Sequence, residues 1–240
     1  YSIIAIVSFI FFCYSNENMK IKVGLFILAL LNFVAVGLNS SRTYYVAILA
    51  TVLLILLRKK IKWFILGTGL IFLLFIGIFK YSFSIKSRII SIFDTKENLS
   101  NVERLWMWKT ALKIMKNHPI IGVGYKNWGK EVEVYFEKEK EQYPLLWIIS
   151  RNYKGGNNEK DVLSTFKGHP HNTYLNVGVS EGLIGLILFV LFWFGNSIMA
   201  FKRARLAEKG SVMYTLNLAV GYSIIMLLIA GFFENNLTTA

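Results

Sequence analysis

The sequence has few of the residues on which metal and nucleotide chemistry depends. Its only two aspartates, Asp94 and Asp161, lie far apart, so neighbouring residues form no Asp-x-Asp metal site for a nucleotide-sugar donor. The three histidines form no His-Glu-x-x-His or comparable ligand pattern. Neither a GxxxxGKS/T phosphate loop nor a GxSxG nucleophile elbow occurs. We therefore expect no bound metal, no cofactor, no phosphate-loop hydrolysis and no lipase-type chemistry.

Cysteine is almost absent as well. The single cysteine, Cys13, lies inside an apolar block, which excludes a disulfide framework, a cysteine zinc site and thiol chemistry. The chain begins at Tyr1 within a hydrophobic run and has no basic segment before it. We interpret this start as a continuation of earlier membrane helices, since a signal peptide would begin with a basic segment.

Apolar sequence, in contrast, is abundant. Of the 240 residues, 55% are hydrophobic and 15% aromatic, far more than a soluble domain of this size can bury. They gather in blocks of roughly 15 to 25 residues with little charge, long enough to cross ~30 Å of hydrocarbon as helices. The alternation of a membrane barrel is absent from these blocks. We expect six spans: Tyr1–Tyr14 (truncated), Val23–Leu38, Thr43–Leu57, Trp63–Phe79, Asn172–Phe201 and Val212–Phe233.

The formal net charge of +13 lies largely at the ends of these blocks, which argues for topology signals and against a nucleic-acid partner. Three connectors on one side carry the basic clusters Lys20/Lys22, Arg58/Lys59/Lys60/Lys62 and Lys202/Arg203/Arg205/Lys209. The positive-inside rule makes that side cytoplasmic. We thus expect residues 1–79 to form four spans, 80–171 an extracytoplasmic loop region, and 172–240 two further spans.

The outer loop is too long for a simple connector and is expected to contain two helices. An apolar face at helical spacing is formed by Leu105, Trp108, Leu112 and Met115. Opposite it lie lysines, and Pro119 ends the run, which predicts an amphipathic helix with Trp106 and Trp108 at the membrane interface. A second helix, about Lys126 to Tyr143, is rich in Glu and Lys and is expected to be solvated on its surface.

Two arginines are candidates for binding a lipid-linked phosphate. Arg42, in Asn39-Ser40-Ser41-Arg42-Thr43, is expected where a helix enters the bilayer from outside, and Arg104 opens the amphipathic helix away from its lysine face. A guanidinium binds phosphate oxygens bidentately and keeps its charge. The alternatives are an Arg42 that snorkels to lipid headgroups and an Arg104 that is simply solvated.

The stretch His169-Pro170-His171-Asn172-Thr173-Tyr174 lies where the polar loop meets the fifth span. Proline fits just before a helix start, so His171 or Asn172 is expected to face the outer mouth of the bundle. Histidine accepts a proton near neutral pH, as activation of a hydroxyl nucleophile requires. The alternative is that these are capping and interfacial residues.

Glu181 is the only acidic residue inside a predicted span, and Gly182 and Gly185 follow it. Charge at membrane depth is costly and usually serves function. The helix could instead break here, which would leave Glu181 in a wet cavity at the end of a short re-entrant segment. An unbroken helix would hold Glu181 too far from His171 to pair with it. We therefore treat Glu181 as a secondary site residue.

Several motifs occur in a characteristic order. They are Ser40-Ser41-Arg42-Thr43, Arg104-x-x-x-Trp108, Pro119-x-x-Gly122-x-Gly124, His169-x-His171-Asn172-x-Tyr174-Leu175 and Glu181-Gly182-x-x-Gly185. With the predicted topology, this set resembles the O-antigen ligase and O-antigen polymerase superfamily of bacterial membrane glycosyltransferases, over about residues 38–190. The Lys- and Glu-rich insert at 126–167 matches no element of that family.

The resemblance implies an all-α, GT-C-like polytopic helix bundle in the bacterial plasma membrane. It also implies a metal-independent, inverting enzyme that moves a glycan from undecaprenyl diphosphate to a glycan, lipid or wall acceptor on the outer face, as polymerase or ligase. Arg42 and Arg104 would hold the diphosphate, and His171, with His169 beside it, would activate the acceptor hydroxyl. Asn172 and Tyr174 would be secondary. A membrane transporter of a small anion or solute, and a non-catalytic scaffold, are the alternatives.

Overall fold

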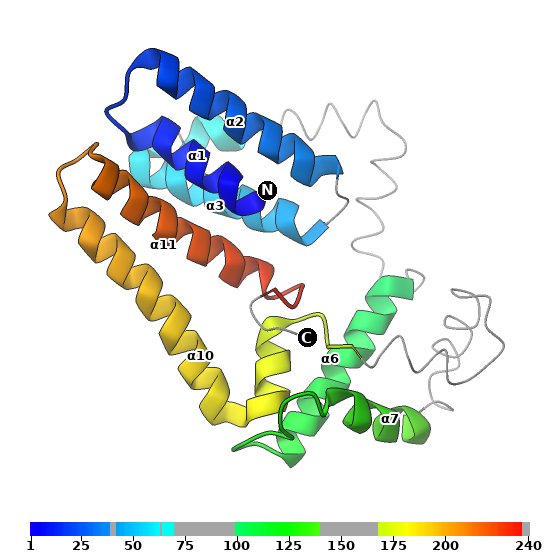
Figure 1. Cartoon of the computed structure of the whole chain (residues 1–240). Coiled ribbons are helices and arrows are strands. Elements are labelled where there is room, and N and C mark those ends of the chain that lie inside the picture. The colour runs from blue at the N-terminus through cyan, green and yellow to red at the C-terminus, as the bar shows by residue number, and fades with distance from the viewer. Residues whose placement is uncertain (39–41, 63, 70–98, 140–167, 237–240) are drawn as a thin grey trace. The chain divides into compact units, whose positions relative to one another are not determined.

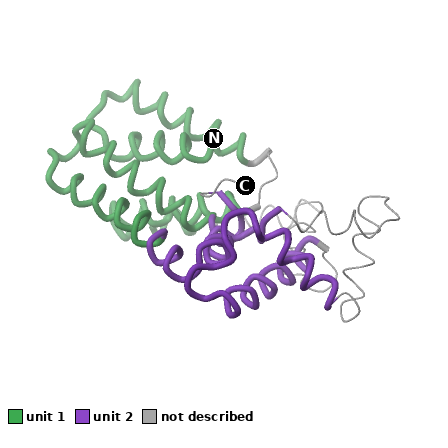
Figure 2. The backbone as a smooth tube through the Cα atoms, turned by 60° about the horizontal axis from the view of Figure 1, so that its bottom comes forward, with its two compact units in different colours: residues 1–74, 190–230 green, residues 75–189, 231–240 purple. Residues whose placement is uncertain are grey.

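The structure is a computed structural model that describes residues 1–38, 42–62, 64–69, 99–139 and 168–236, without the side chains of residues 37, 38, 42 and 99. The regular structure in these ranges is entirely helical, which confirms the predicted all-α class. The chain divides into two compact units, shown in Figure 2. Unit 1 comprises Tyr1–Leu74 and Val190–Ala230, and unit 2 comprises Phe75–Phe189 and Gly231–Ala240.

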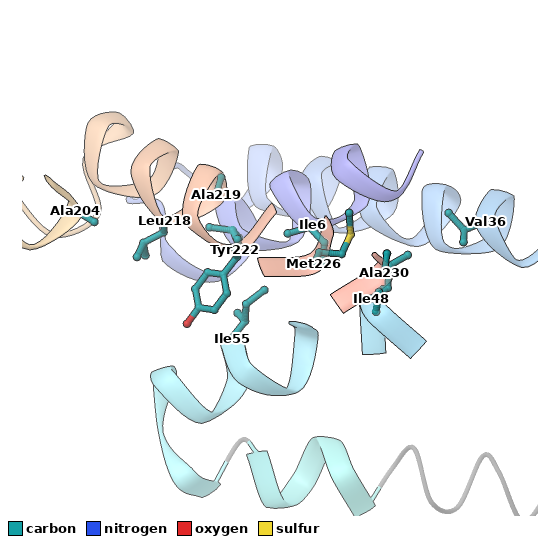
Figure 3. Close-up of a cluster of buried hydrophobic side chains, with 12 residues drawn as sticks. Ile6, Val36, Ile48, Ile55, Ala204, Leu218, Ala219, Tyr222, Met226 and Ala230 are labelled. Atoms are coloured by element: carbon teal, nitrogen blue, oxygen red, sulfur yellow. The ribbon is translucent and has the colours of Figure 1, made fainter. Parts of the chain in front are cut away.

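Unit 1 is a bundle of apolar helices. Its helices are α1 (Ser2–Tyr14), α2 (Met19–Leu38), α3 (Arg42–Lys59) and α11 (Val212–Ala230), labelled in Figure 1. Helix α10 spans Thr173–Leu206, and its part from Val190 onward also belongs to this unit. Helix α1 packs against α2 and α11, and α3 packs against α11. Figure 3 shows the buried cluster between them, which includes Ile6, Ile48, Ile55, Leu218, Met226 and several alanines. Small residues of this kind let membrane helices approach closely.

Among the described residues, three helices are long and apolar enough to cross a membrane: Met19–Val36, Thr173–Leu206 and Val212–Ala230. They correspond to the second, fifth and sixth predicted spans. The first and third predicted spans are helical too, but α1 is short and α3 is flanked by charges that include Arg58 and Lys59. The fourth, Trp63–Phe79, lies mostly outside the described residues. The division into segments 1–79, 80–171 and 172–240 stays a prediction.

The basic connectors lie at one end of unit 1. The backbone N–H of Asn16 donates to the carbonyl of Gly210 at 2.9 Å, which joins the α1–α2 connector to the α10–α11 connector. Lys59, at the end of α3, donates to the carbonyl of Cys13 at 3.2 Å. The three basic clusters therefore share one end, as the sequence predicts, and their assignment to the cytoplasm remains a prediction.

Unit 2 is built around helices α6 (Leu99–Asn117) and α7 (Trp128–Glu139). Trp106 of α6 is only 3% exposed and lies edge-on to Phe136 of α7, with ring centroids 6.0 Å apart. The predicted apolar face of α6 is therefore wrong in part: Met115 packs against the core, but Leu112 is 56% exposed. Trp106, which was expected at the membrane interface, is buried in a protein core. The position of α7 explains why the buried face differs from the predicted one. Helix α7 packs on the side of α6 that carries Trp106, Met107, Ala111 and Ile114.

Helix α7 is likewise less solvated than its composition suggests. Trp128, Val132 and Phe136 recur at a spacing of four and are all buried against α6. The charged residues occupy its other sides, and Glu139 pairs with Lys113 of α6. The expectation of a solvated helix thus holds only for the outer faces of α7, and the remainder of the predicted helix, from residue 140, lies outside the described residues.

Helix α10 breaks at Gly182, where the bend is visible in Figure 1. Gly182 has φ 68° and ψ −166°, a backbone conformation that is essentially restricted to glycine. The break divides α10 into a short first segment, residues 173–181, and a long second segment. The structure therefore confirms the helix break that the sequence left open as an alternative for Glu181.

The loop at residues 119–124 satisfies the backbone groups that the break exposes. It donates to the end of the first segment and accepts from the start of the second. The four bonds are Val123 N to Val179 O, Gly124 N to Ser180 O and Leu183 N to Pro119 O, each 2.8 Å, and Ile184 N to Ile120 O, 3.4 Å. Both ends of the break are thus fixed to the loop that follows α6.

Candidate active site

The site lies where α10 begins, and Asn172 fixes that position. Its side-chain oxygen accepts from the backbone N–H of Leu175 at 3.0 Å, which makes Asn172 the N-cap of the helix. Its amide group donates to the carbonyl of Phe232 at 2.9 Å. Asn172 therefore joins the start of α10 to the turn at residues 231–236, in the capping role that the sequence left open.

Further bonds hold the backbone on both sides of His171. Thr173 donates from its backbone N–H to Gly231 O at 2.8 Å and from its hydroxyl to Glu234 O at 2.9 Å. Trp108 of α6 donates from its indole N–H to the carbonyl of Pro170 at 2.9 Å. Segments far apart in sequence thus determine where the imidazole of His171 lies.

His171 itself adopts the left-handed backbone conformation, with φ 49°. Its Nδ1 lies 3.0 Å from Oε1 of Glu234. The carboxylate favours the tautomer with the proton on Nδ1, which leaves the lone pair on Nε2. Among the residues that the structure describes, none forms a hydrogen bond to Nε2. The His171 side chain is 36% exposed.

Glu234 connects His171 to Arg104. Its second oxygen, Oε2, lies 3.7 Å from Nη2 of Arg104, and the backbone N–H of Asn235 donates to Oε1 at 3.3 Å. The hydrogen bond from His171 lowers the pKa of Glu234 by more than burial raises it. Glu234 is therefore an anion at neutral pH, and it lies between an imidazole and a guanidinium.

Arg104 is anchored to the same turn. Its Nη1 donates to the carbonyl of Phe233 at 3.2 Å, and about a third of its side chain is exposed. A guanidinium has five N–H donors, so these contacts leave donors for a further anion. Arg104 is thus both a support for Glu234 and a fixed positive charge beside His171.

Two more ionisable groups face His171. His169 accepts from the backbone N–H of His171 through Nδ1 at 3.2 Å, and the two rings lie edge-on with centroids 4.5 Å apart. Burial, and then the proximity of His171, lower the pKa of His169, which favours the neutral ring. Burial raises the pKa of Glu103 on α6, although His171 and Arg104 act in the opposite direction.

A family model described as O-antigen ligase matches residues 24–190, more than half of the chain. The chain belongs to the O-antigen ligase family. Membership indicates membrane glycosyl transfer of the ligase or polymerase type, with lipid-linked glycan donors and acceptors. It also agrees with the three apolar helices in indicating a membrane protein. No curated protein matches the chain.

The matched region of this O-antigen ligase family member includes every candidate site residue that the sequence indicated. The structure brings Arg104, His169, His171 and Asn172 together in unit 2. Tyr174 packs on Phe232, with ring centroids 4.6 Å apart. Glu181 is exposed at the far end of the short first segment of α10.

Arg42 begins α3 in unit 1, and its side chain is not among those that the structure describes. Its convergence with Arg104 and His171 therefore stays a prediction. Asp94, Asp161 and residues 140–167 of the insert also lie outside the described residues.

Sequence reasoning missed Glu234, which lies beyond the segment that matches the family. A signal was present, because Glu234 directly follows the last apolar span on the side predicted for His171. Consecutive spans run antiparallel, so the end of the sixth returns to the level at which the fifth begins. The role of Trp108 was also missed, because a tryptophan in an amphipathic pattern gives no indication that its N–H reaches a loop carbonyl.

Proposed function

We propose that this member of the family transfers a glycan from undecaprenyl diphosphate to a hydroxyl of a glycan, lipid or wall acceptor on the outer face of the bacterial plasma membrane. It acts as a surface polysaccharide polymerase or O-antigen ligase, in a GT-C-like bundle whose residues 80–171 are extracytoplasmic. One observation carries this proposal: Nδ1 of His171 lies 3.0 Å from the Glu234 carboxylate, which leaves Nε2 to act as a base.

The reaction is an inverting displacement. The acceptor oxygen bonds to the anomeric carbon of the donor glycan and gives its proton to Nε2 of His171. The bond from that carbon to the diphosphate breaks, and undecaprenyl diphosphate leaves with the electron pair. Glu234 stabilises the imidazolium that forms, as an orienting carboxylate does in a nucleophile-activating pair. General base catalysis of this kind is worth about 10²- to 10⁴-fold in rate.

The diphosphate is neutralised by Arg42 and Arg104 without a metal ion in the reaction. Guanidinium groups bind phosphate oxygens through charge-assisted hydrogen bonds, and a fixed cation needs little reorganisation as the leaving group gains charge. Two features support this role for Arg104: its partial exposure and its anchorage to Phe233. Arg42 supplies the second cation from the start of α3.

A broken helix such as α10 is also found in transporters, but the contacts at this break do not favour transport. In transporters, discontinuous helices present their backbone ends to the substrate or ion. At Gly182, the backbone groups of both helix ends are bonded to the loop at 119–124, so they are not available for a transported solute. Glycosyl transfer is therefore the better supported function.

The test is transfer by purified protein from a glycan linked to undecaprenyl diphosphate, with chain length or acceptor labelling as the readout. His171→Ala is expected to lower kcat at least 100-fold, and Arg42→Ala or Arg104→Ala to weaken use of the lipid-linked donor. His118→Ala is the matched control, because this exposed histidine at the end of α6 is expected to leave transfer unchanged. Normal product from well-folded His171→Ala protein would exclude the base role.

A further inference from the structure

A second property of the site follows from the side chains around His171. His169, His171 and Glu234 each offer one ligand atom, and these atoms lie within 4.8 Å of one another. All three side chains are partly buried, which limits competition from bulk water. The residues come from two segments of unit 2 that the bonds of Asn172 and Thr173 hold together.

The spacing is close to that of a metal site. Zinc bonds of about 2.0 to 2.1 Å in tetrahedral geometry place neighbouring ligand atoms roughly 3.3 Å apart. Nδ1 of His171 and Oε1 of Glu234 are already 3.0 Å apart. His169, whose Nδ1 accepts from the His171 backbone N–H, contributes the third ligand atom, a nitrogen. This nitrogen lies within 4.8 Å of the other two ligand atoms and moves closer to them when an ion binds.

The types of ligand decide the class of ion. Two imidazoles and one carboxylate suit zinc, copper and nickel ions, whereas magnesium prefers oxygen ligands alone. Three protein ligands leave a fourth position open to water or to another oxygen. We propose that His169, His171 and Glu234 form a binding site for one divalent transition-metal ion of the Zn²⁺ class.

Arg104 opposes the ion without excluding it. Its Nη2 faces Oε2 of Glu234, whereas Oε1 faces His171, so the two oxygens can hold the guanidinium and the ion at the same time. The positive charge of Arg104 lowers the affinity for a cation. The ion also replaces the hydrogen bond between His171 and Glu234, so the metal-bound form and the hydrogen-bonded form exclude each other.

If His171 is the base, as the proposed function holds, a bound ion affects glycan transfer. An ion on Nδ1 of His171 requires the ring proton to be on Nε2, because a neutral imidazole has one N–H and one lone pair. Nε2 then has no lone pair with which to accept the proton of the acceptor hydroxyl. The site is therefore inhibitory: transfer proceeds in the presence of a chelator and falls when Zn²⁺ is added.

The binding test uses the full chain in detergent after treatment with a chelator. Co²⁺ titration is expected to give the intense visible absorption of a tetrahedral complex at one ion per chain, and Zn²⁺ is expected to displace it. His169→Ala and Glu234→Gln are each expected to weaken binding at least tenfold. His118→Ala, which removes the third histidine of the chain, is expected to bind as the wild type does.

The outcomes separate the two proposals. A wild-type protein that shows no such absorption, or a His169→Ala variant that binds Co²⁺ with undiminished affinity, overturns the metal site and leaves the transferase untouched. Co²⁺ binding in a folded protein that transfers no glycan in the presence of a chelator supports the site and contradicts the proposed function. Transfer that Zn²⁺ inhibits, and that added chelator restores, supports both.

Discussion

Replacing Gly182 with alanine tests the role of the break in α10 in holding the active site. Gly182 has φ 68° and ψ −166°, which a residue with a Cβ atom adopts only under strain. A Cβ built on Gly182 would lie 2.2 Å from the carbonyl oxygen of Ile120, well inside van der Waals contact. The neighbouring atom is backbone, so it cannot move aside as a flexible side chain would.

Both costs can be given a magnitude. A non-glycine residue in this region of conformational space costs about 1–3 kcal/mol. Overpacking against a fixed neighbour costs about 1–3 kcal/mol more. If the loop moves to relieve the overlap, the bonds of Leu183 to Pro119 and Ile184 to Ile120 weaken instead, at a similar cost. We expect Gly182→Ala to lower the free energy of unfolding by about 2–6 kcal/mol.

The assay is denaturant unfolding in detergent, with Gly195→Ala as the matched control. Gly195 lies in the same helix, and a Cβ there would meet no atom within 4 Å. Helix propensity predicts that Gly195→Ala is neutral or stabilises by up to about 1 kcal/mol. Unfolding free energies for the two variants that agree within about 0.5 kcal/mol would refute the reasoning. Gly182→Ala should also lower transfer activity, whereas Gly195→Ala should not. The reason is that the short first segment of α10, which begins directly after His171, ends at Gly182.

Three further predictions concern the support of His171. Glu234→Gln keeps the size of the side chain but removes the charge opposite the imidazolium, so kcat should fall about 10- to 100-fold while KM for the acceptor changes little. In the transfer assay, Glu234→Asp should recover part of the loss. Trp108→Phe keeps an aromatic ring but removes the indole N–H that donates to Pro170, and should cost about 1 kcal/mol or more in unfolding measurements. Asn172→Ala should cost about 1–2 kcal/mol in the same measurements, and Asn172→Ser, which can cap the helix, should cost less.

The sequence predicted the helical class and six spans, of which three are long apolar helices in the described part of the chain. These predictions succeeded because the length of apolar blocks and the charge at their ends are local properties of the chain. The proximity of Arg104 to His169 and His171, in contrast, was expected only from the order of motifs that resembles the family. The buried face of α6 was not predicted, because the choice between Leu112 and Trp106 depends on where α7 packs, and both patterns have helical spacing.

Glu234 was not predicted, for a related reason, although its place directly after the last apolar span was a signal. It lies 63 residues after His171, and the contact depends on the turn at 231–236 folding back onto the start of α10. Ligand-spacing rules depend on short, characteristic separations in sequence, so they do not detect a group that includes a residue 63 positions away. The absence of a metal motif in the sequence therefore did not exclude the three ligand atoms that the fold brings together.

The first segment of α10 behaves as a short helix fixed at both ends. At its start, Asn172 and Thr173 bond to the turn at 231–236, and at its end the loop at 119–124 bonds across the break. Since Trp108 also holds the loop before it, His171 lies between fixed points on α6, on the turn and on α10. An isolated helix of this length is marginal in water, so its stability depends on these contacts. The position of the base is therefore a tertiary property, and substitutions at Gly182 or Asn172 should alter catalysis although neither side chain needs to touch the substrate.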